Sequence, residues 1–335
     1  MGQTVVFTVS LDADDVAIEH VEPRPPQNPF RDAAGAAIRD RAWRIAALLV
    51  LVLPAIAAAV AFAITRGPWV TTTFLAAAAL VTPASAAWAA TRRVSGDAQA
   101  RVAGWAVAGF AGAALAVPSV AGVVMVARAE QWNENGTGPT LAVLALSGAA
   151  GAWLGLALGN LRRAWHPVAA GTAAVLLVLA PLAVCAALLP ATASTDEVES
   201  YVFTTASGGS RPEFVCGLET VEATRRHTEA VAWIAFGSPL AWVVDAASHT
   251  PGDLARAADG SAAQVQAWTR SSRLGPDAFQ GYCYQPTSLG PPTGVIEARY
   301  EAAGPLGAKS ATGAVMLLGA LALAAVSWRR SPSPS

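Results

Sequence analysis

Long apolar windows, separated by short segments that carry arginines, dominate the pattern of this 335-residue chain. A membrane-spanning helix needs about 20 mostly apolar residues. Six windows are long enough, and we expect spans at residues 45–65, 69–90, 104–127, 140–160, 167–190 and 311–328. The pattern therefore predicts an all-α polytopic membrane protein with six transmembrane helices.

The long segment 191–309, between the fifth and sixth predicted spans, has a mixed pattern. Residues 199–205 (ESYVFTT) have the composition of a strand, and residues 251–270 have the ragged apolar periodicity of a polar helix. Prolines and glycines in 285–306 indicate an irregular return to the membrane. We expect a small α+β domain between these two spans.

One apolar run within this domain is too short to cross a bilayer. It extends from Ala230 to Val244 and is interrupted by the helix-breaking triplet Gly237-Ser238-Pro239. Such a run is typical of an interfacial, re-entrant or buried element. The residues that mark this outer interrupted helix are Trp233, Pro239, Trp242 and Asp245.

The N-terminal segment 1–44 is polar, and its second half has helical periodicity. Ala34, Ile38 and Ala42 share one face with Ile45. This pattern indicates either a helix on the membrane surface or a solvated helix that leads into the first span. The first apolar run begins near Ile45, which is too late for a cleaved signal peptide, so we expect an uncleaved anchor.

Arginines gather on alternate connections between the predicted spans. They precede the first span and follow the second, fourth and sixth, whereas the other short loops carry only Arg66 and Arg128. The arginines before the first span and after the second, fourth and sixth are Arg39, Arg41, Arg44, Arg92, Arg93, Arg101, Arg162, Arg163, Arg329 and Arg330. The positive-inside rule then places both termini in the cytoplasm.

This orientation divides the chain into five parts. We expect a cytoplasmic segment 1–44, five spans within 45–190, an extracytoplasmic domain 191–309, a sixth span within 310–328 and a cytoplasmic tail 329–335. The chain would then be a multi-pass protein of the cell membrane, with the lipid bilayer as its surroundings.

Composition excludes some functions. The chain is 54% hydrophobic and 13% charged, about half the charged fraction of an ordinary soluble domain. A net charge of −1 argues against a nucleic-acid binder. The predicted spans carry no Asp, Glu, Lys, Arg or His well inside the bilayer, which disfavours an ion-coupled secondary transporter.

Two of the three cysteines, Cys216 and Cys283, lie in the segment 191–309. In an oxidising compartment this pair is expected to form a disulfide, with two free thiols as the alternative. Cys185 lies in the fifth predicted span.

Small residues recur every fourth position in the fourth predicted span, at Ser147, Gly151, Gly155 and Gly159. Such a stripe lets another helix approach closely. An intramolecular contact is favoured over a dimer interface, because glycine is common in membrane helices. Prolines at Pro54, Pro83, Pro118 and Pro181 are expected to kink or locally open four spans.

The motifs of common catalytic and cofactor sites are not found in the sequence. There is no phosphate-cradling loop, no GxSxG elbow and no HExxH, and the four histidines do not have the spacing of a metal site. We therefore expect no catalytic, cofactor-binding or metal-binding residues. Any ATP hydrolysis would belong to a partner subunit.

A set of motifs around the interrupted helix resembles a known family. His227-Thr228-Glu229 precedes a run through Pro239 to Asp245-Ala246-Ala247, and Arg273-Leu274-Gly275-Pro276 follows. These motifs, with Cys216 and Cys283 on either side, resemble the outer region of actinobacterial ABC-2-type transporter permeases, in which HTE is followed by a WWLLAPNPF-like run that ends in ADAAP. Trp233, Pro239 and Asp245 match, whereas Ala232, Gly237, Ser238 and Ser248 depart from the pattern.

The resemblance implies six spans, cytoplasmic termini, short helices in the outer leaflet, and a homodimer that works with a separate cytoplasmic ABC ATPase. It also implies that residues 31–44 form the surface helix that receives motion from the ATPase. The sequence thus predicts the permease subunit of an ABC-2-like exporter. The alternative is a membrane-anchored binding or scaffold protein that acts through segment 191–309, and an intramembrane enzyme is the third reading.

Overall fold

Five helices of the computed structural model are long and apolar enough to cross a membrane: Arg41–Thr65, Val70–Ala89, Gln99–Ala129, Thr137–Gly159 and Pro167–Thr192. They confirm the first five predicted spans. The structure describes residues 28–67, 69–91, 98–131, 136–161, 167–206, 213–246, 261–275, 279–280 and 319. The predicted sixth span, 311–328, lies outside these residues apart from Gly319.

The elements of the bundle are α1 (Pro29–Arg39), α2 (Arg41–Thr65), α3 (Val70–Ala89), α4 (Ala98–Ala114), η1 (Val117–Ser119), α5 (Val120–Ala129), α6 (Thr137–Leu161) and α7 (Pro167–Leu188). The third span is therefore composite, because α4 and α5 are joined by the 3₁₀ turn η1 at Pro118. The other three prolines lie within continuous helices. Proline removes a helical N–H and crowds the preceding turn, which favours the opening at Pro118, but the same property does not interrupt α2, α3 or α7.

Two capped helices occupy the N-terminal region. The side chain of Asn28 accepts a hydrogen bond from the Phe30 N–H at the start of α1, and Asp40 Oδ1 accepts one from the Ala42 N–H, 2.9 Å away, at the start of α2. Asp40 is extended, so the helix expected in the second half of segment 1–44 is divided there. Every residue of α1 is at least partly exposed, and α1 contacts α4.

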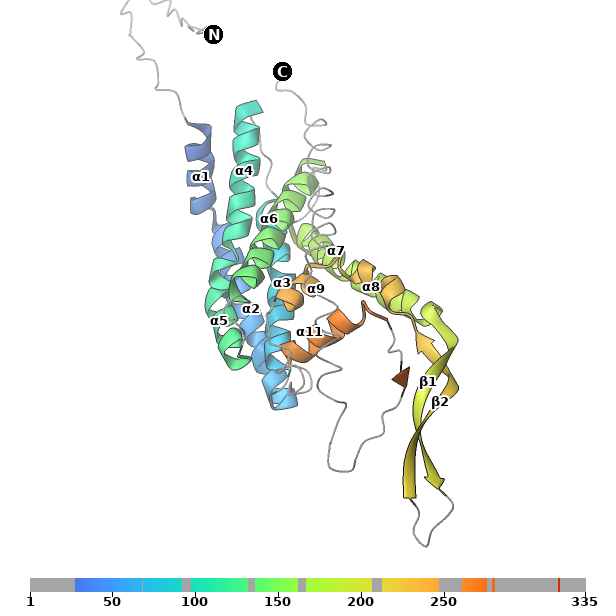
Figure 1. Ribbon diagram of the computed structural model, residues 1–335. Coiled ribbons are helices and arrows are strands. Elements are labelled where there is room, and N and C mark those ends of the chain that lie inside the picture. Colours follow the sequence, from blue (N-terminus) through green and yellow to red (C-terminus); the bar gives the residue numbers. More distant parts are fainter. Residues whose placement is uncertain are drawn as a thin grey trace, which may run out of the picture.

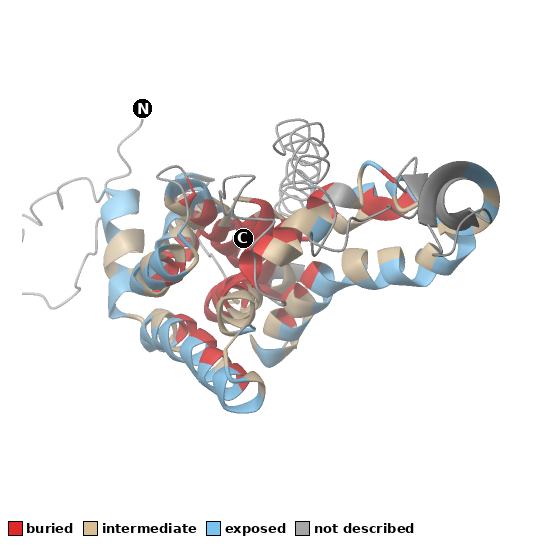
Figure 2. Ribbon diagram, turned by 60° about the horizontal axis from the view of Figure 1, so that its bottom comes forward, coloured by how far each residue is buried: buried red, intermediate tan, exposed pale blue. Residues whose placement is uncertain are grey.

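The centre of the bundle is formed by α3 and α6 (Figure 1). About half of the apolar window is buried in α3 (50%) and α6 (56%), against 22% in α2 and 11% in α7. Figure 2 shows the same contrast, with buried residues gathered in the middle and exposed residues along α2 and α7. Outer helices of this kind present apolar side chains to their surroundings, as expected in lipid.

The small-residue stripe of α6 lies against the backbone of α3. A Cβ atom added at Gly151 would overlap the Pro83 carbonyl oxygen, and one added at Gly155 would overlap that of Ala87. Gly159 faces the Thr91 carbonyl in the same way. Ser147 is buried, and its hydroxyl donates to the Leu144 carbonyl of its own helix at 2.8 Å. The glycines thus allow an intramolecular backbone contact that a larger residue would prevent.

After the fifth span the described part of the chain forms a small sheet and three short helices. The 3₁₀ turn η2 (Leu189–Thr192) leads into β1 (Ala193–Ala206), which pairs antiparallel with β2 (Glu213–Arg226) over its whole length. The short β3 (Phe279–Gln280) pairs parallel with β1, so the order is β2-β1-β3. The β1–β2 ribbon extends away from the helices (Figure 1). The strand expected at 199–205 is therefore the second half of a longer strand.

The three helices are α8 (Glu229–Ala235), α9 (Pro239–Ala246) and α11 (Ala262–Ser271). α11 covers the second half of the polar helix expected at 251–270, whose first half lies outside the described residues. α8 contacts α7, whereas α9 contacts α3, α6 and α11. The chain beyond the fifth span thus returns to the bundle.

We predict that Gly155→Ala destabilises the bundle, because the new methyl group forces α6 away from the Ala87 carbonyl. Such overpacking costs about 1–3 kcal/mol. Gly138→Ala is the matched control, since nothing lies within 4 Å of a Cβ added at that position of the same helix. Thermal unfolding in detergent should show a lower midpoint for Gly155→Ala alone, and equal midpoints for the two variants would contradict the close packing.

Candidate functional site

The outer interrupted helix consists of two short helices joined at the break. α8 ends at Ala235, and α9 begins with Pro239 as its first residue. Proline is well tolerated there because the first helical N–H has no partner within the helix. The Ser238 hydroxyl accepts a hydrogen bond from the Leu240 N–H at 3.3 Å. Each half is too short to span a membrane.

α9 is inserted into one end of the bundle. We name this the distal end, where the α2–α3 and α5–α6 connections lie. Val243 of α9 is fully buried in a cluster with Leu75, Val126 and Leu144. These partners lie within the three turns of α3, α5 and α6 nearest the distal end, so α9 reaches about 5–10 Å into the bundle at 1.5 Å per residue. It is a packed element with its apolar side chains in the core.

A buried carboxylate anchors the end of α9. The side chain of Asp245 is 3% exposed, and its Oδ1 accepts a hydrogen bond from Arg270 Nε at 3.1 Å. Arg273 Nη2 lies 3.8 Å from the same oxygen, and Gln266 donates to the Asp245 carbonyl at 3.0 Å. A charge is tolerated in such a place only when it is paired and hydrogen-bonded. The ion pair therefore fixes α11 on α9.

A second charged cluster joins α8 to the base of the ribbon. His227 Nδ1 lies 2.8 Å from Glu229 Oε1, and His227 Nε2 lies 2.8 Å from Asp196 Oδ2 and 2.9 Å from Ser194 Oγ. The His227 N–H also donates to the Thr192 carbonyl at 3.0 Å. These bonds connect β1 to His227, which lies two residues before α8, and His227 in turn to Glu229 in the first turn of α8.

Both carboxylates favour the protonated histidine. The hydrogen bonds from Glu229 and then Asp196 raise the pKa of His227 above its usual 6.5. The hydrogen bonds from Ser194 and then His227 lower the pKa of Asp196 below its usual 3.8. An imidazolium donates from both ring nitrogens, which suits this geometry.

The Ser194, His227 and Glu229 side chains have the order of a hydrolytic triad, but the cluster has a different chemistry. Ser194 donates its proton to Asp196 Oδ1 at 2.7 Å, and Asp196 also occupies His227 Nε2. A general base requires a neutral imidazole whose Nε2 is directed at the nucleophile. The two carboxylates instead favour the protonated ring, so the geometry favours an ion cluster.

The sequence motifs around this element meet in space. The Thr228 hydroxyl donates to the Ser272 carbonyl at 2.7 Å, beside the turn that contains Arg273 and Gly275. Gly275 has φ +75°, and a Cβ added there would overlap the Glu229 carboxylate. The Arg273 guanidinium lies 5.7 Å from the centre of the Phe236 ring. His-Thr-Glu, Asp245 and Arg-Leu-Gly thus form one structural unit.

The two tryptophans of the interrupted helix differ in exposure. Trp233 is 63% exposed and donates from Nε1 to the Ala230 carbonyl at 2.8 Å. Trp242 is half-buried and donates to the Phe236 carbonyl at 2.7 Å, across the break. Trp242 therefore supports the turn between α8 and α9, whereas Trp233 is bonded only within its own helix region and is largely exposed.

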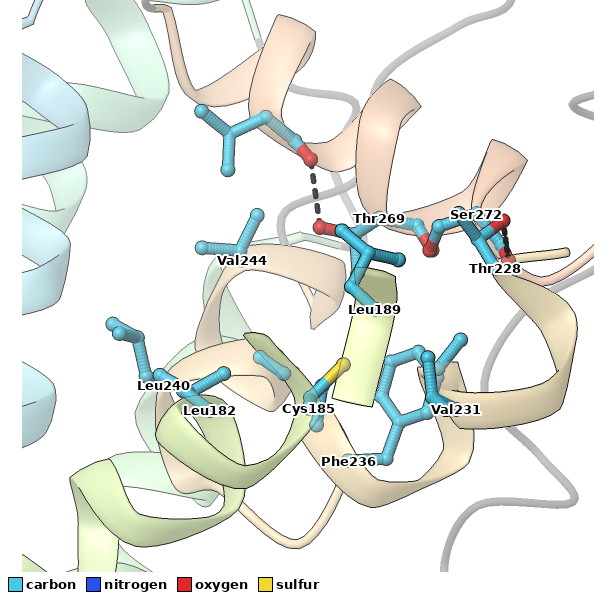
Figure 3. Close-up of a pocket in the computed structure, with 14 residues that line it drawn as sticks. Leu182, Cys185, Leu189, Thr228, Val231, Phe236, Leu240, Val244, Thr269 and Ser272 are labelled. Atoms are coloured by element: carbon cyan, nitrogen blue, oxygen red, sulfur yellow. Dashed lines mark hydrogen bonds between the residues drawn. The ribbon is translucent and has the colours of Figure 1, made fainter. Parts of the chain in front are cut away.

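A cavity of about 290 Å³ lies where α7, α8, α9 and α11 meet (Figure 3). Leu182, Cys185 and Leu189 form its wall from the fifth span. Cys185 is a free thiol, and Figure 3 shows its Sγ directed into the space between the labelled side chains. Cys216 lies on β2 opposite Phe203, while Cys283 is outside the described residues, so their disulfide stays a prediction.

Sequence reasoning identified Asp245 but not its pairing with Arg270, and it overlooked Asp196 as a partner of His227. The pairing of Asp245 could have been expected from the sequence, because a carboxylate within an apolar run needs a cation nearby. Within the part of the chain that is described, no group of three or more His, Cys, Asp or Glu residues could hold a metal ion.

No protein-family model, no curated protein and no solved structure matches this chain. The likeness to ABC-2-type permeases therefore rests on the residues around His227 and Asp245 themselves.

We predict that Asp245→Ala is strongly destabilising, because it leaves Arg270 buried without its carboxylate. Removing one partner of a buried ion pair costs about 3–5 kcal/mol. Glu222→Ala, at an exposed position of β2, is the control. Unfolding in detergent should separate the two variants clearly, and a neutral Asp245→Ala would show that the pair does not hold α11 on α9.

The stability that the His227 cluster contributes should depend on pH. Because the pKa of His227 is raised in the folded protein, its contribution to the free energy of unfolding is complete below pH 6.5. That contribution is lost as the pH rises through the raised pKa. The contribution of Asp196, whose pKa is lowered, is lost only as the pH falls below 3.8.

An NMR titration of ¹³C-labelled histidines measures this directly, with His227→Gln to assign the signal. We expect the His227 pKa to lie above 6.5 in the wild type and to fall in Asp196→Asn. A His227 pKa of 6.5 or below in both proteins would rule the cluster out.

Proposed function

We propose that this chain is the membrane-spanning permease subunit of an ABC-2-like exporter that works with a separate cytoplasmic ATPase. The observation that carries the proposal is the α8–α9 pair, which follows the fifth span and is packed among α3, α6 and α7. An interrupted helix in this position is what the resemblance implies. Its anchors, His227 and Asp245, are residues on which that resemblance depends.

The arginine pattern supports the orientation that this function needs. With the positive-inside rule, α1 and the α3–α4 connection lie in the cytoplasm. The distal end of the bundle, the α8–α9 pair and the ribbon then lie on the outer side. An ATPase would contact the end that carries α1, and cargo would leave near α9.

The N-terminal helices offer a mechanical route. α1 is separately capped, continues into α2 through the extended Asp40, and contacts α4. Motion of α1 would therefore be transmitted to the first and third spans together. The 3₁₀ turn at Pro118 provides a joint at which α4 could move relative to α5. In this mechanism, ATP-driven closure of the partner subunits rocks two copies of the bundle between inward-open and outward-open forms.

The spans suit a lipophilic or amphiphilic cargo. Apart from Cys185, the ionisable side chains of the described spans are at or near their ends, as with Arg101 and Arg128. Such walls do not compensate the desolvation of a charged solute.

The long ribbon favours a second candidate, a membrane-anchored binding or scaffold protein. β1 and β2 each have 14 residues and extend away from the helices. An isolated two-stranded ribbon is only marginally stable in water, so a ligand or partner on the ribbon would stabilise it. This candidate requires that segment 191–309 binds an envelope ligand without any ATPase.

Affinity purification of the tagged full-length protein from its native host tests the two candidates. We expect an ATPase with a P-loop motif to co-purify with the wild type. Ile38, 76% exposed on α1, is a candidate contact, so Ile38→Ser should reduce the recovered ATPase. Ala36→Ser, at an exposed position on another face of α1, should not. Recovery of a lone monomer without any ATPase would contradict the exporter and favour the scaffold.

A further inference from the structure

The cavity between α7 and the three short helices lies at the level of a membrane span. Leu182, Cys185 and Leu189 belong to the last turns of the fifth span, Pro167–Thr192. The opposite walls come from α8, α9 and α11, through residues such as Phe236, Leu240 and Val265 (Figure 3). The cavity is therefore enclosed partly by a span and partly by the element that folds back on it.

The chemistry of the lining selects an apolar occupant. None of the lining residues that the structure describes is charged. Its hydroxyl groups donate to backbone carbonyls: Thr228 to Ser272 at 2.7 Å, Thr269 to Val265 at 2.7 Å, and Ser272 to Thr269 at 2.9 Å. Because these protons are already donated, a polar ligand would lose its hydration without a matching donor. Apolar cavities accept apolar ligands.

The volume fits part of one hydrocarbon chain. An apolar cavity of about 150 Å³ holds a benzene molecule, which has six carbon atoms. The present cavity, at about 290 Å³, has room for about twice as many. A bulky or multi-chain ligand would exceed this volume.

The surface beside the cavity indicates where such a chain comes from. Val184 and Leu188, neighbours of Cys185 and Leu189 on α7, are 47% and 42% exposed. Only 11% of the apolar window of this span is buried. The apolar face of α7 would be in contact with lipid tails, and the cavity wall is the adjoining face of the same turns.

We propose that this cavity binds the end of one acyl chain of a membrane lipid from the leaflet at the distal end of the bundle. The chain would pack against Cys185, Ala235 and Phe236 and would connect the fifth span to the α8–α9 pair. Lipid in this position would hold α8 in place without any charged contact. The inference stands apart from the proposed function, because it requires no ATPase and no transport.

Photocrosslinking in nanodiscs tests the proposal on the full-length protein. The probe is phosphatidylcholine with a diazirine at the end of one acyl chain, present as a minor component in ordinary phosphatidylcholine. Mass spectrometry should locate crosslinks on the wall residues Leu182, Cys185, Leu189, Val231, Phe236 and Leu240. Val184 and Leu188 provide the internal reference, since exposed positions are labelled whether or not the cavity is occupied.

Two variants of α8 sharpen the result. Ala235→Phe fills the cavity and should reduce the wall crosslinks several-fold relative to those at Val184 and Leu188. Ala230→Phe adds the same side chain at an exposed position of the same helix and should leave the wall crosslinks unchanged. Equal wall crosslinking in both variants, with melting temperatures like the wild type, would overturn the proposal, as would crosslinks confined to the exposed face of α7.

The wild-type thiol gives a second measurement that needs no variant to fold. A maleimide with a long alkyl chain should modify Cys185 at least several-fold faster than a sulfonated maleimide, with the modified residue identified by mass spectrometry. Equal rates would mean a hydrated site and would overturn the proposal. An ATPase that fails to co-purify would leave both lipid results unchanged.

Discussion

The close approach of α3 and α6 is the contact on which the other parts of the structure depend. Gly151, Gly155 and Gly159 allow the carbonyls of α3 to lie against the α6 backbone, with no side chain between them. These two helices are the most buried of the five spans. Their distal turns supply Leu75 and Leu144, against which Val243 of α9 packs. A wider separation of α3 and α6 would therefore remove the surface that receives the interrupted helix.

The interrupted helix combines an apolar anchor with a charged one. Val243 is held by burial in the bundle, whereas Asp245, two residues later, is held by Arg270 of α11. Arg273 continues the connection to Phe236, which lines the cavity. At the other end, His227 ties α8 to β1 through Asp196. The α8–α9 pair is thus fixed at both ends, with the cavity between it and the fifth span.

The spans could be predicted from sequence because length and hydropathy suffice for them. The second expected span, 69–90, agrees closely with Val70–Ala89, whereas the third, 104–127, proved longer because the polar start of Gln99–Ala129 is helical as well. β1 was underestimated because Asp196 and Glu197 interrupt its apolar pattern before the expected strand begins, although both side chains are at least partly exposed within β1. The Asp245–Arg270 pair and the cavity between α7, α8, α9 and α11 could not be predicted. They depend on contacts between elements that are far apart in the sequence, and a local sequence pattern carries no information about such contacts.

The central claim is that α9 is inserted between the distal ends of α3 and α6. Disulfide trapping in native membranes measures this most directly, with Leu75→Cys and Val243→Cys introduced together after the three native cysteines are replaced by serine. The account predicts rapid crosslinking of this pair and none between Leu75→Cys and Trp233→Cys. Equal crosslinking of both pairs, or none of either, would contradict it.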